Sequence, residues 1–85
     1  MNQYYVYAIE SLKDGRIYVG LSLNVDRRIQ EHNAGQTRST KPWRPWKLIF
    51  SKMVGKRKNA RALEKKLKSG YGKEFLKRLI KTIIY

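Results

Sequence analysis

Two short segments rich in aromatic and β-branched residues lie near the start of the chain, on either side of a turn signal. The segments cover residues 3–9 and 16–21, and Asp14-Gly15 lies between them. Tyr, Val and Ile suit a pleated, half-buried surface. Gly accepts the positive φ that a tight turn requires. The pattern therefore predicts a β-hairpin, which constrains the chain to a fold with an antiparallel sheet at its start.

A helix is predicted to follow the hairpin, over residues 25–33. Asn24 is a suitable N-cap, because its side chain accepts a hydrogen bond from an unpaired backbone N–H. Val25 and Ile29 are four residues apart and are expected to face the core. Asn33 and Gly35 end the helix, and residues 34–46, which contain two prolines, form a loop.

The second half of the chain predicts a strand and two helices. Residues 47–54 form the third strand, and residues 55–58 form a basic turn. Asn59 is the expected cap of a helix over 60–69, which Gly70-Tyr71-Gly72 interrupts before a last helix over 73–83.

The predicted order β-β-α-β-α-α indicates a single α/β domain over residues 1–85. We expect a small three-stranded sheet, mixed or antiparallel, flanked by helices. A chain of 85 residues buries only about 60–65% of its unfolded surface, so its core is thin. A shallow face or cleft is therefore a better expectation for a functional site than an enclosed cavity.

The charge of the chain predicts an acidic partner. The formal net charge is +14, and residues 43–85 hold 14 of the 20 basic residues but only two of the six acidic ones. A polyanion relieves such self-repulsion, so nucleic acid is the first candidate and an anionic membrane surface the second. The chain has no Cys and one His, which excludes disulfides, thiolate metal sites and multi-His zinc sites. Without a membrane-spanning run or a secretory signal, we expect a soluble cytoplasmic protein.

Several short motifs occur along the chain in an order that is typical of one nuclease family. Tyr5-Val6-Tyr7 and Tyr18-Val19-Gly20 lie on the two hairpin strands, with Tyr7 and Tyr18 eleven residues apart. The later motifs are Asn24 to Ile29, Glu31-His32-Asn33, Gly35, Pro45 to Leu48 and Ala62-Leu63-Glu64. Over roughly residues 4–72 the chain resembles the GIY-YIG nucleases, specifically small stand-alone members that look like the N-terminal catalytic domain of the nucleotide-repair excinuclease. It departs from that pattern at Tyr5, which replaces Gly, and by Val in place of Ile in both motifs.

The resemblance implies a phosphodiester-cleaving site. It makes Tyr7 the general base and gives Tyr18 the task of orienting the water or a phosphate oxygen. Arg28 would stabilise the charge that develops on the phosphate. Glu64 would bind one divalent cation, Mg²⁺ or Mn²⁺, together with the substrate phosphate. His32, four residues after Arg28 on the same helix face, would hydrogen-bond a phosphate or relay a proton.

To act as a general base near neutral pH, Tyr7 needs surroundings that favour its ionised form. A free Tyr has a pKa of about 10 and is a poor base near neutrality. The charge of Arg28, a Lys or the metal would favour the phenolate.

Each candidate residue also has a structural interpretation. Tyr7 and Tyr18 would then be packing residues, and His32 a structural histidine. Arg27 is the alternative to Arg28, and Glu64 has Lys68 as an ion-pair partner at i,i+4. Trp43 and Trp46 are expected to cover the thin core or fix the loop, although stacking on bases is the alternative.

A basic run in the second half of the chain is the expected DNA-contacting surface. With few acidic neighbours to pair with, its side chains favour phosphate contact over a merely solvated helix face. The run comprises Lys56, Arg57, Lys58, Arg61, Lys65, Lys66 and Lys68.

The sequence therefore predicts a small divalent-metal-dependent DNA endonuclease that acts by in-line attack of water. Because 85 residues hold no separate base-reading element, we expect structure-directed or weakly sequence-specific cutting of branched, nicked or single-stranded DNA. The resemblance implies a role in repair or recombination. The alternatives are a non-catalytic nucleic-acid-binding module with the same fold and a subunit whose protein partner supplies specificity. Hydrolysis requires Tyr7, Tyr18, Arg28 and Glu64 to meet in one shallow pocket on the sheet.

Overall fold

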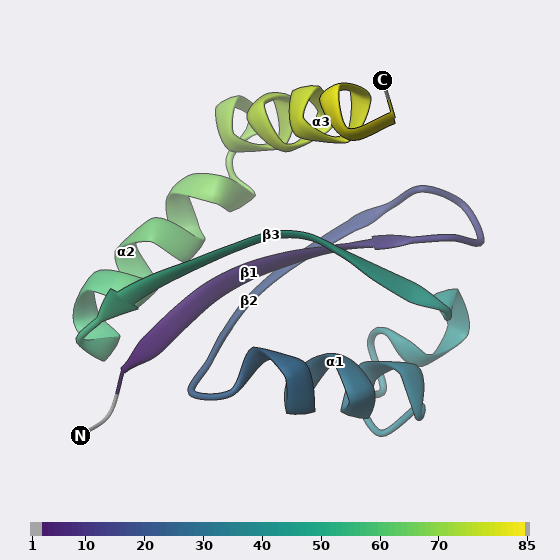
Figure 1. The fold of residues 1–85 in the computed structure, drawn as a ribbon, viewed down its shortest axis with the longest axis horizontal. Helices are drawn as coiled ribbons and strands as arrows, with labels where there is room; N and C mark the ends of the chain where they lie inside the picture. Colours follow the sequence, from purple (N-terminus) through teal and green to yellow (C-terminus); the bar gives the residue numbers. More distant parts are fainter. Residues whose placement is uncertain (1–2, 85) are drawn as a thin grey trace.

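The computed structural model describes residues 3–84 and contains a three-stranded sheet and three α-helices (Figure 1). The order is the predicted one, with one short 3₁₀ helix added inside the loop between α1 and β3. The elements are β1 (Tyr4–Ser11), β2 (Ile17–Ser22), α1 (Val25–Asn33), η1 (Lys41–Trp43), β3 (Trp46–Gly55), α2 (Arg57–Lys68) and α3 (Gly70–Ile84).

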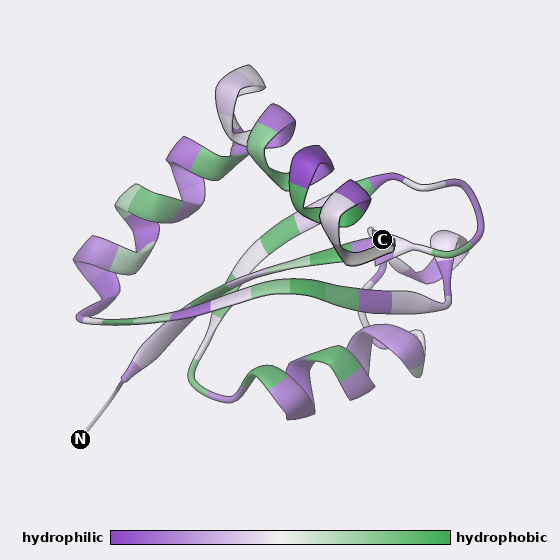
Figure 2. Cartoon of the chain, turned by 45° about the horizontal axis from the view of Figure 1, so that its top comes forward, coloured by the Kyte–Doolittle hydropathy of each residue, from purple (hydrophilic) through white to green (hydrophobic). Residues whose placement is uncertain are grey.

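The sheet has β1 in the centre, and both of its neighbours run antiparallel to it. The strand order is β2-β1-β3, with Tyr7 opposite Gly20 on β2 and opposite Ser51 on β3. The antiparallel form of the predicted sheet is therefore confirmed. Helices α2 and α3 cover one face and α1 covers the other, as Figures 1 and 2 both show.

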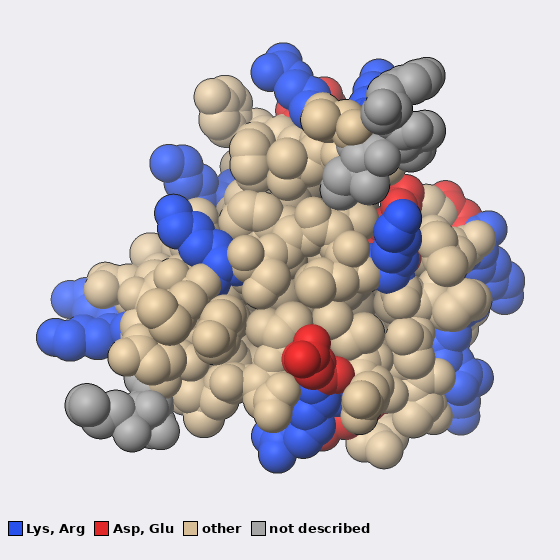
Figure 3. All heavy atoms as spheres, in the orientation of Figure 1, with Lys and Arg blue, Asp and Glu red and all other residues tan. Residues whose placement is uncertain are grey.

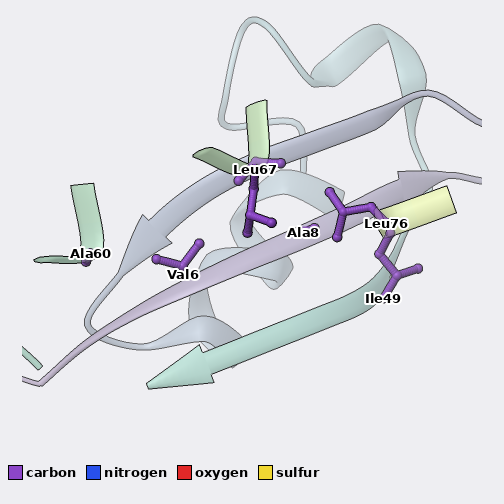
Figure 4. Packing of buried hydrophobic residues seen from close by; sticks show 7 residues of the cluster. Val6, Ala8, Ile49, Ala60, Leu67 and Leu76 are labelled. Carbon is purple, nitrogen blue, oxygen red and sulfur yellow. The ribbon is translucent and has the colours of Figure 1, made fainter. Parts of the chain in front are cut away.

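Strand alternation divides the apolar side chains between the two faces of the sheet. Val6 and Ala8 of β1 point toward α2 and α3, whereas Tyr7 and Ile9 belong to the cluster beneath α1. The first cluster, drawn in Figure 4, comprises Val6, Ala8, Val19, Ile49, Ala60, Leu67 and Leu76. The second is smaller and more aromatic: buried Tyr7, Ile9 and Trp46, with half-buried Tyr18, Val25, Ile29 and Trp43.

The start of α2 differs from the prediction. The helix covers 57–68 rather than 60–69, and its N-cap is Lys56, which makes no side-chain capping hydrogen bond. Asn59 therefore does not cap it. The chain leaves β3 through Gly55 at a φ of 101° and coils at once, so that Ala60 is fully buried against the sheet. Tertiary packing of the apolar face outweighs the local capping preference.

The break between the last two helices also lies earlier than predicted. Ser69 has an extended backbone, and α3 begins at Gly70 rather than at residue 73. The Ser69 hydroxyl accepts a hydrogen bond from the Gly72 N–H at 3.3 Å, so Ser69 caps α3. Gly70, Tyr71 and Gly72 form its first turn instead of a linker.

The first helix matches its prediction at both ends. It covers residues 25–33, and the Asn24 side chain accepts a hydrogen bond from the Arg27 N–H at 3.0 Å. Gly35 follows with a φ of 81°, and the Gln36 N–H bonds to the Glu31 carbonyl at 3.0 Å. The left-handed conformation of Gly35 and the hydrogen bond from Gln36 back to Glu31 together form a Schellman-type helix end.

Within residues 3–84, no helix combines the length and the hydropathy that crossing a membrane requires.

A methyl group at Gly72 should destabilise the fold, while one at Gly70 should not. A Cβ at Gly72 would lie within 2.4 Å of the Leu67 Cα, so the α2–α3 packing would have to open. Overpacking of this kind costs about 1–3 kcal/mol or more. Gly70→Ala meets nothing within 4 Å and should leave stability unchanged or raise it by up to about 1 kcal/mol. Urea unfolding of the two variants measures the difference, and equal midpoints would contradict this account.

Candidate active site

The Tyr7 side chain passes over the backbone of the edge strand β2 at Gly20. Its side chain is 1% exposed, and it lies opposite Gly20 in the β1–β2 register. A Cβ on Gly20 would lie 2.7 Å from the Tyr7 hydroxyl oxygen and 3.1 Å from the Tyr18 ring. The missing side chain at Gly20 therefore gives the phenol its path toward α1.

His32, from the last turn of α1, meets the end of this phenol. His32 is fully buried, and its Nε2 lies 2.8 Å from the Tyr7 Oη. Its Nδ1 lies 2.8 Å from the Oγ1 of Thr40, in the loop after α1. Half-buried Tyr18 completes the group, with its ring edge-on to the His32 imidazole at a centroid distance of 5.1 Å. The geometry thus brings Tyr7, Tyr18 and His32 into one cluster.

Burial keeps both titratable groups of the Tyr7–His32 pair neutral. It raises the pKa of Tyr7 to about 12, and the neighbouring Tyr18 adds to this effect. It lowers the pKa of His32 to about 4, aided by the positive charge of Arg28. Arg28 also acts to lower the pKa of Tyr7, which is the predicted direction, but burial outweighs it. In the protein without metal and substrate, the charge of Arg28 is therefore not sufficient to favour the phenolate.

Arg28, rather than Arg27, faces this cluster. The Arg28 side chain is 33% exposed, and its charge affects the pKa of both Tyr7 and His32. Its Nη1 donates a hydrogen bond to Glu31 Oε1 at 3.0 Å, which fixes the guanidinium on the helix surface. Arg27 is 69% exposed and pairs loosely with Glu31 at 3.8 Å. Between the two predicted registers, the geometry favours Arg28.

Glu64 approaches from the other layer of the protein. It lies on α2, and its side chain is 9% exposed. Its carboxylate interacts with Arg61 at 3.5 Å and with Lys68 at 3.4 Å, the second being the predicted i,i+4 pair. Its negative charge contributes to the raised pKa of Tyr7, so the two groups interact electrostatically. The structure gathers Tyr7, Tyr18, Arg28 and His32, whereas convergence of Glu64 with them stays a prediction.

The described side chains suit a cation bound through one carboxylate better than a cation bound by a complete set of protein ligands. Among the described residues, no three His, Asp or Glu side chains gather around a common point. Glu64 supplies two oxygens, each facing a cation at a distance longer than that of a tight ion pair. Mg²⁺ usually keeps several waters and binds through one or two carboxylates and substrate phosphates. Glu64 suits that mode, in which a nucleic acid completes the coordination.

The loop after α1 contributes Thr40, a residue that the sequence did not indicate. Trp46 is buried, and its Nε1 donates to the Thr40 carbonyl oxygen at 2.9 Å. The Asn33 side chain accepts from the Trp46 N–H at 2.7 Å and donates to its carbonyl at 3.2 Å. The tryptophans cover the core as expected, and the Arg16 guanidinium stacks 3.3 Å from the ring centre of half-buried Trp43. No local signal marks Thr40, because its partner is eight residues away.

The predicted basic run lies on the outer face of α2 and the turn before it. All seven of its side chains are exposed. Arg61 and Lys68 pair with Glu64, and within the described part of the chain Lys58 and Lys65 form no ion pair. Figure 3 shows Lys and Arg projecting mainly from the rim of one face, whose centre is largely uncharged. The first turn of α2 contains no acidic residue, so the helix dipole there favours an added anion.

Comparison with known proteins identifies the same family that the motifs indicated. The family described as "GIY-YIG catalytic domain" matches residues 3–78. A UPF0213 protein of Syntrophus aciditrophicus is 41% identical over 56 residues, which cover 64% of this chain and 63% of that protein. A UPF0213 protein of Staphylococcus aureus is 33% identical over 82 residues, covering 95% of this chain and 98% of the relative.

A solved structure supports the fold. The solution NMR structure of a UPF0213 protein from Bacillus halodurans is 34% identical and has a TM-score of 0.55. The match covers 91% of this chain and 84% of that one.

Replacing His32 with Gln should remove part of the acid sensitivity of folding. The pKa of His32 falls from its ordinary 6.5 to about 4 in the folded protein, so the unfolded chain binds a proton that the folded chain does not. The free energy of unfolding therefore falls as the pH drops from 6.5 to 4, by at most about 3 kcal/mol from this residue. Urea titrations at pH 7 and pH 4 should show a larger loss for the wild type than for H32Q. Parallel losses would contradict the assignment.

Proposed function

The chain belongs to the GIY-YIG catalytic domain family, and we propose that it is a divalent-metal-dependent DNA endonuclease that cuts phosphodiester bonds with water. The observation that carries this proposal is the cluster of Tyr7, Tyr18, Arg28 and His32 beneath α1. These are the side chains that the family motifs single out.

Proton transfer in the proposed reaction runs through Tyr7. Its pKa of about 12 keeps the phenol protonated at rest, so it must lose one proton as it takes another from the attacking water. His32 Nε2, 2.8 Å away, is placed to receive that proton. The pKa of His32, about 4 in the free protein, is lowered partly by Arg28. A phosphate beside Arg28 offsets that charge and makes His32 a better acceptor.

The other residues act on the phosphate. Arg28, held by Glu31, would stabilise the charge that grows on the phosphate oxygens as the bond to the leaving oxygen breaks. Tyr18, half-buried at the edge of the cluster, would orient the water or one of those oxygens. Glu64 would hold Mg²⁺ or Mn²⁺, which supplies positive charge for the phosphate and the leaving oxygen. The leaving oxygen takes its proton from solvent.

The proposed DNA contacts lie on α2. Lys58 and Lys65 are exposed on this helix, and the uncapped first turn favours phosphate. Contacts to phosphate carry no base sequence, so we propose structure-directed or weakly sequence-specific cutting of branched, nicked or single-stranded DNA. A role in DNA repair or recombination is part of this proposal and is supported by the family resemblance.

A second candidate is a DNA-binding module without catalysis. The observation that favours it is the pairing of Glu64 with Arg61 and Lys68. If Glu64 kept both ion pairs while the protein was bound to DNA, its carboxylate would be unavailable to a metal ion.

Replacing Glu64 with Gln separates the two candidates. We expect E64Q to lose cleavage of branched or nicked DNA by about 10²–10³-fold in Mg²⁺ or Mn²⁺, while its affinity for DNA is kept or increased. E74Q makes the same change at an exposed carboxylate on α3 (68% exposed) and should cut like the wild type. Cleavage products are followed on gels and binding by fluorescence anisotropy. If the wild type binds every substrate and cuts none of them, the binding module is the correct function.

Removing two charges from α2 should weaken the salt dependence of DNA binding. Each phosphate contact contributes about one to the slope of log K against log salt. The double variant K58Q/K65Q should therefore lower that slope by about two. K81Q, an exposed change near the far end of α3, should leave the slope near its wild-type value. If K81Q lowered the slope as much as K58Q/K65Q does, the DNA would contact another part of the surface.

A further inference from the structure

Thr40 is a buried residue in an otherwise exposed stretch of the loop. It is 1% exposed, whereas Arg38, Ser39 and Lys41 around it are exposed. Its hydroxyl lies 2.8 Å from His32 Nδ1, on the side of the imidazole opposite Tyr7. A polar group buried in this way is retained only with its hydrogen bonds made. Within the described residues, every buried side-chain nitrogen and oxygen has a partner.

The hydrogen bonds around Thr40 favour one arrangement of protons. Thr40 Oγ1 lies 3.3 Å from the Thr37 carbonyl oxygen, which only accepts and which also receives the N–H groups of Thr40 and Lys41. When the Thr40 hydroxyl donates to this carbonyl, Thr40 Oγ1 is left as the acceptor for a proton on His32 Nδ1. A neutral imidazole has one N–H, so in this arrangement Nε2 is bare and accepts from the Tyr7 hydroxyl.

The loop holds Thr40 in this position from its backbone. The Thr40 carbonyl accepts from Trp46 Nε1 at 2.9 Å, and the Thr40 N–H donates to the Thr37 carbonyl at 3.2 Å. Trp46 belongs to the apolar cluster beneath α1, so packing of the core fixes the hydroxyl opposite the imidazole.

We propose that Thr40 is a positioning residue that fixes His32 in its Nδ1–H tautomer and thereby keeps Nε2 free to receive the proton of Tyr7. The inference rests on the proposed function for its catalytic consequence, though not for the tautomer itself. In the other tautomer Nε2 carries the proton and donates to Tyr7. The phenol then has no acceptor for its own proton when it takes one from water.

The tautomer is measured directly by ¹⁵N NMR of the imidazole. At pH 7 the wild-type protein should show a protonated Nδ1 and a bare Nε2 in long-range ¹H–¹⁵N correlation spectra. T40S keeps the hydroxyl and should show the same pattern. T40V keeps the shape and removes the hydroxyl, and should move protonation toward Nε2. T82V, at an exposed threonine of α3, is the matched control and should match the wild type.

Cleavage rates add a second readout. T40V should lower the rate constant for DNA cleavage by more than tenfold at saturating DNA, because a wrong tautomer disables proton transfer without removing the base. T40S should restore most of the rate, and DNA affinity should change little in either variant.

The outcomes separate this inference from the proposed function. A bare Nδ1 in the wild type overturns the inference without any variant, and so does a T40V spectrum identical to that of the wild type. T40S that cuts as slowly as T40V also overturns it. The expected tautomer change in proteins that cut no DNA supports the assignment of Thr40 and overturns the proposed nuclease.

Discussion

The close approach of a phenol to a strand backbone is the constraint on which the candidate site depends. Tyr7 reaches His32 only because Gly20 has no side chain in its path. Strand alternation explains the rest of the two hairpin motifs. Tyr7 and Tyr18 contribute to the cluster beneath α1, whereas Val6 and Val19 are buried under α2 and α3. Each motif thus carries one site residue and one core residue on neighbouring positions.

This division accounts for the departures from the family pattern. Val6 and Val19 stand where the family has Ile, and both lie in the apolar core, where a change of one methylene alters packing without altering chemistry. Tyr5 stands where the family has Gly. It is half-buried and lines a surface hollow beside Leu23 and Leu48, so the fold accommodates its ring.

The site and the core beneath α1 are built from the same side chains. Tyr7 and Trp46 are buried in that cluster, and His32 is fully buried. Such polar groups are tolerated in a thin core because each has a hydrogen-bond partner and because burial holds them neutral. The same burial that stabilises the fold therefore removes the phenolate that a simple general base would need. In the proposed mechanism, Tyr7 therefore needs a proton acceptor beside it.

Sequence reasoning succeeded where the determining interactions are local. The hairpin was predicted from the Asp14-Gly15 turn, α1 from the Asn24 cap and the Glu64–Lys68 pair from helix spacing, and all three are present. It failed where tertiary packing decides. Burial of Ala60 sets the start of α2 against the capping preference of Asn59. Thr40 and the raised pKa of Tyr7 depend on which loops and strands surround them, which no local pattern records.

In the proposed enzyme, the charge distribution would couple the remaining residue, Glu64, to the arrival of DNA. Its partners Arg61 and Lys68 are more than half exposed and lie at 3.5 and 3.4 Å, whereas the Glu64 side chain itself is 9% exposed. In the proposed enzyme, phosphates compete for these two cations and a metal ion competes for the carboxylate. The two exchanges would occur together, because the cations released by the carboxylate pair with phosphate and the carboxylate released by the cations pairs with the metal ion. In that enzyme, a carboxylate paired with two exposed cations in a strongly basic half of the chain would exchange those cations for a metal ion when DNA binds.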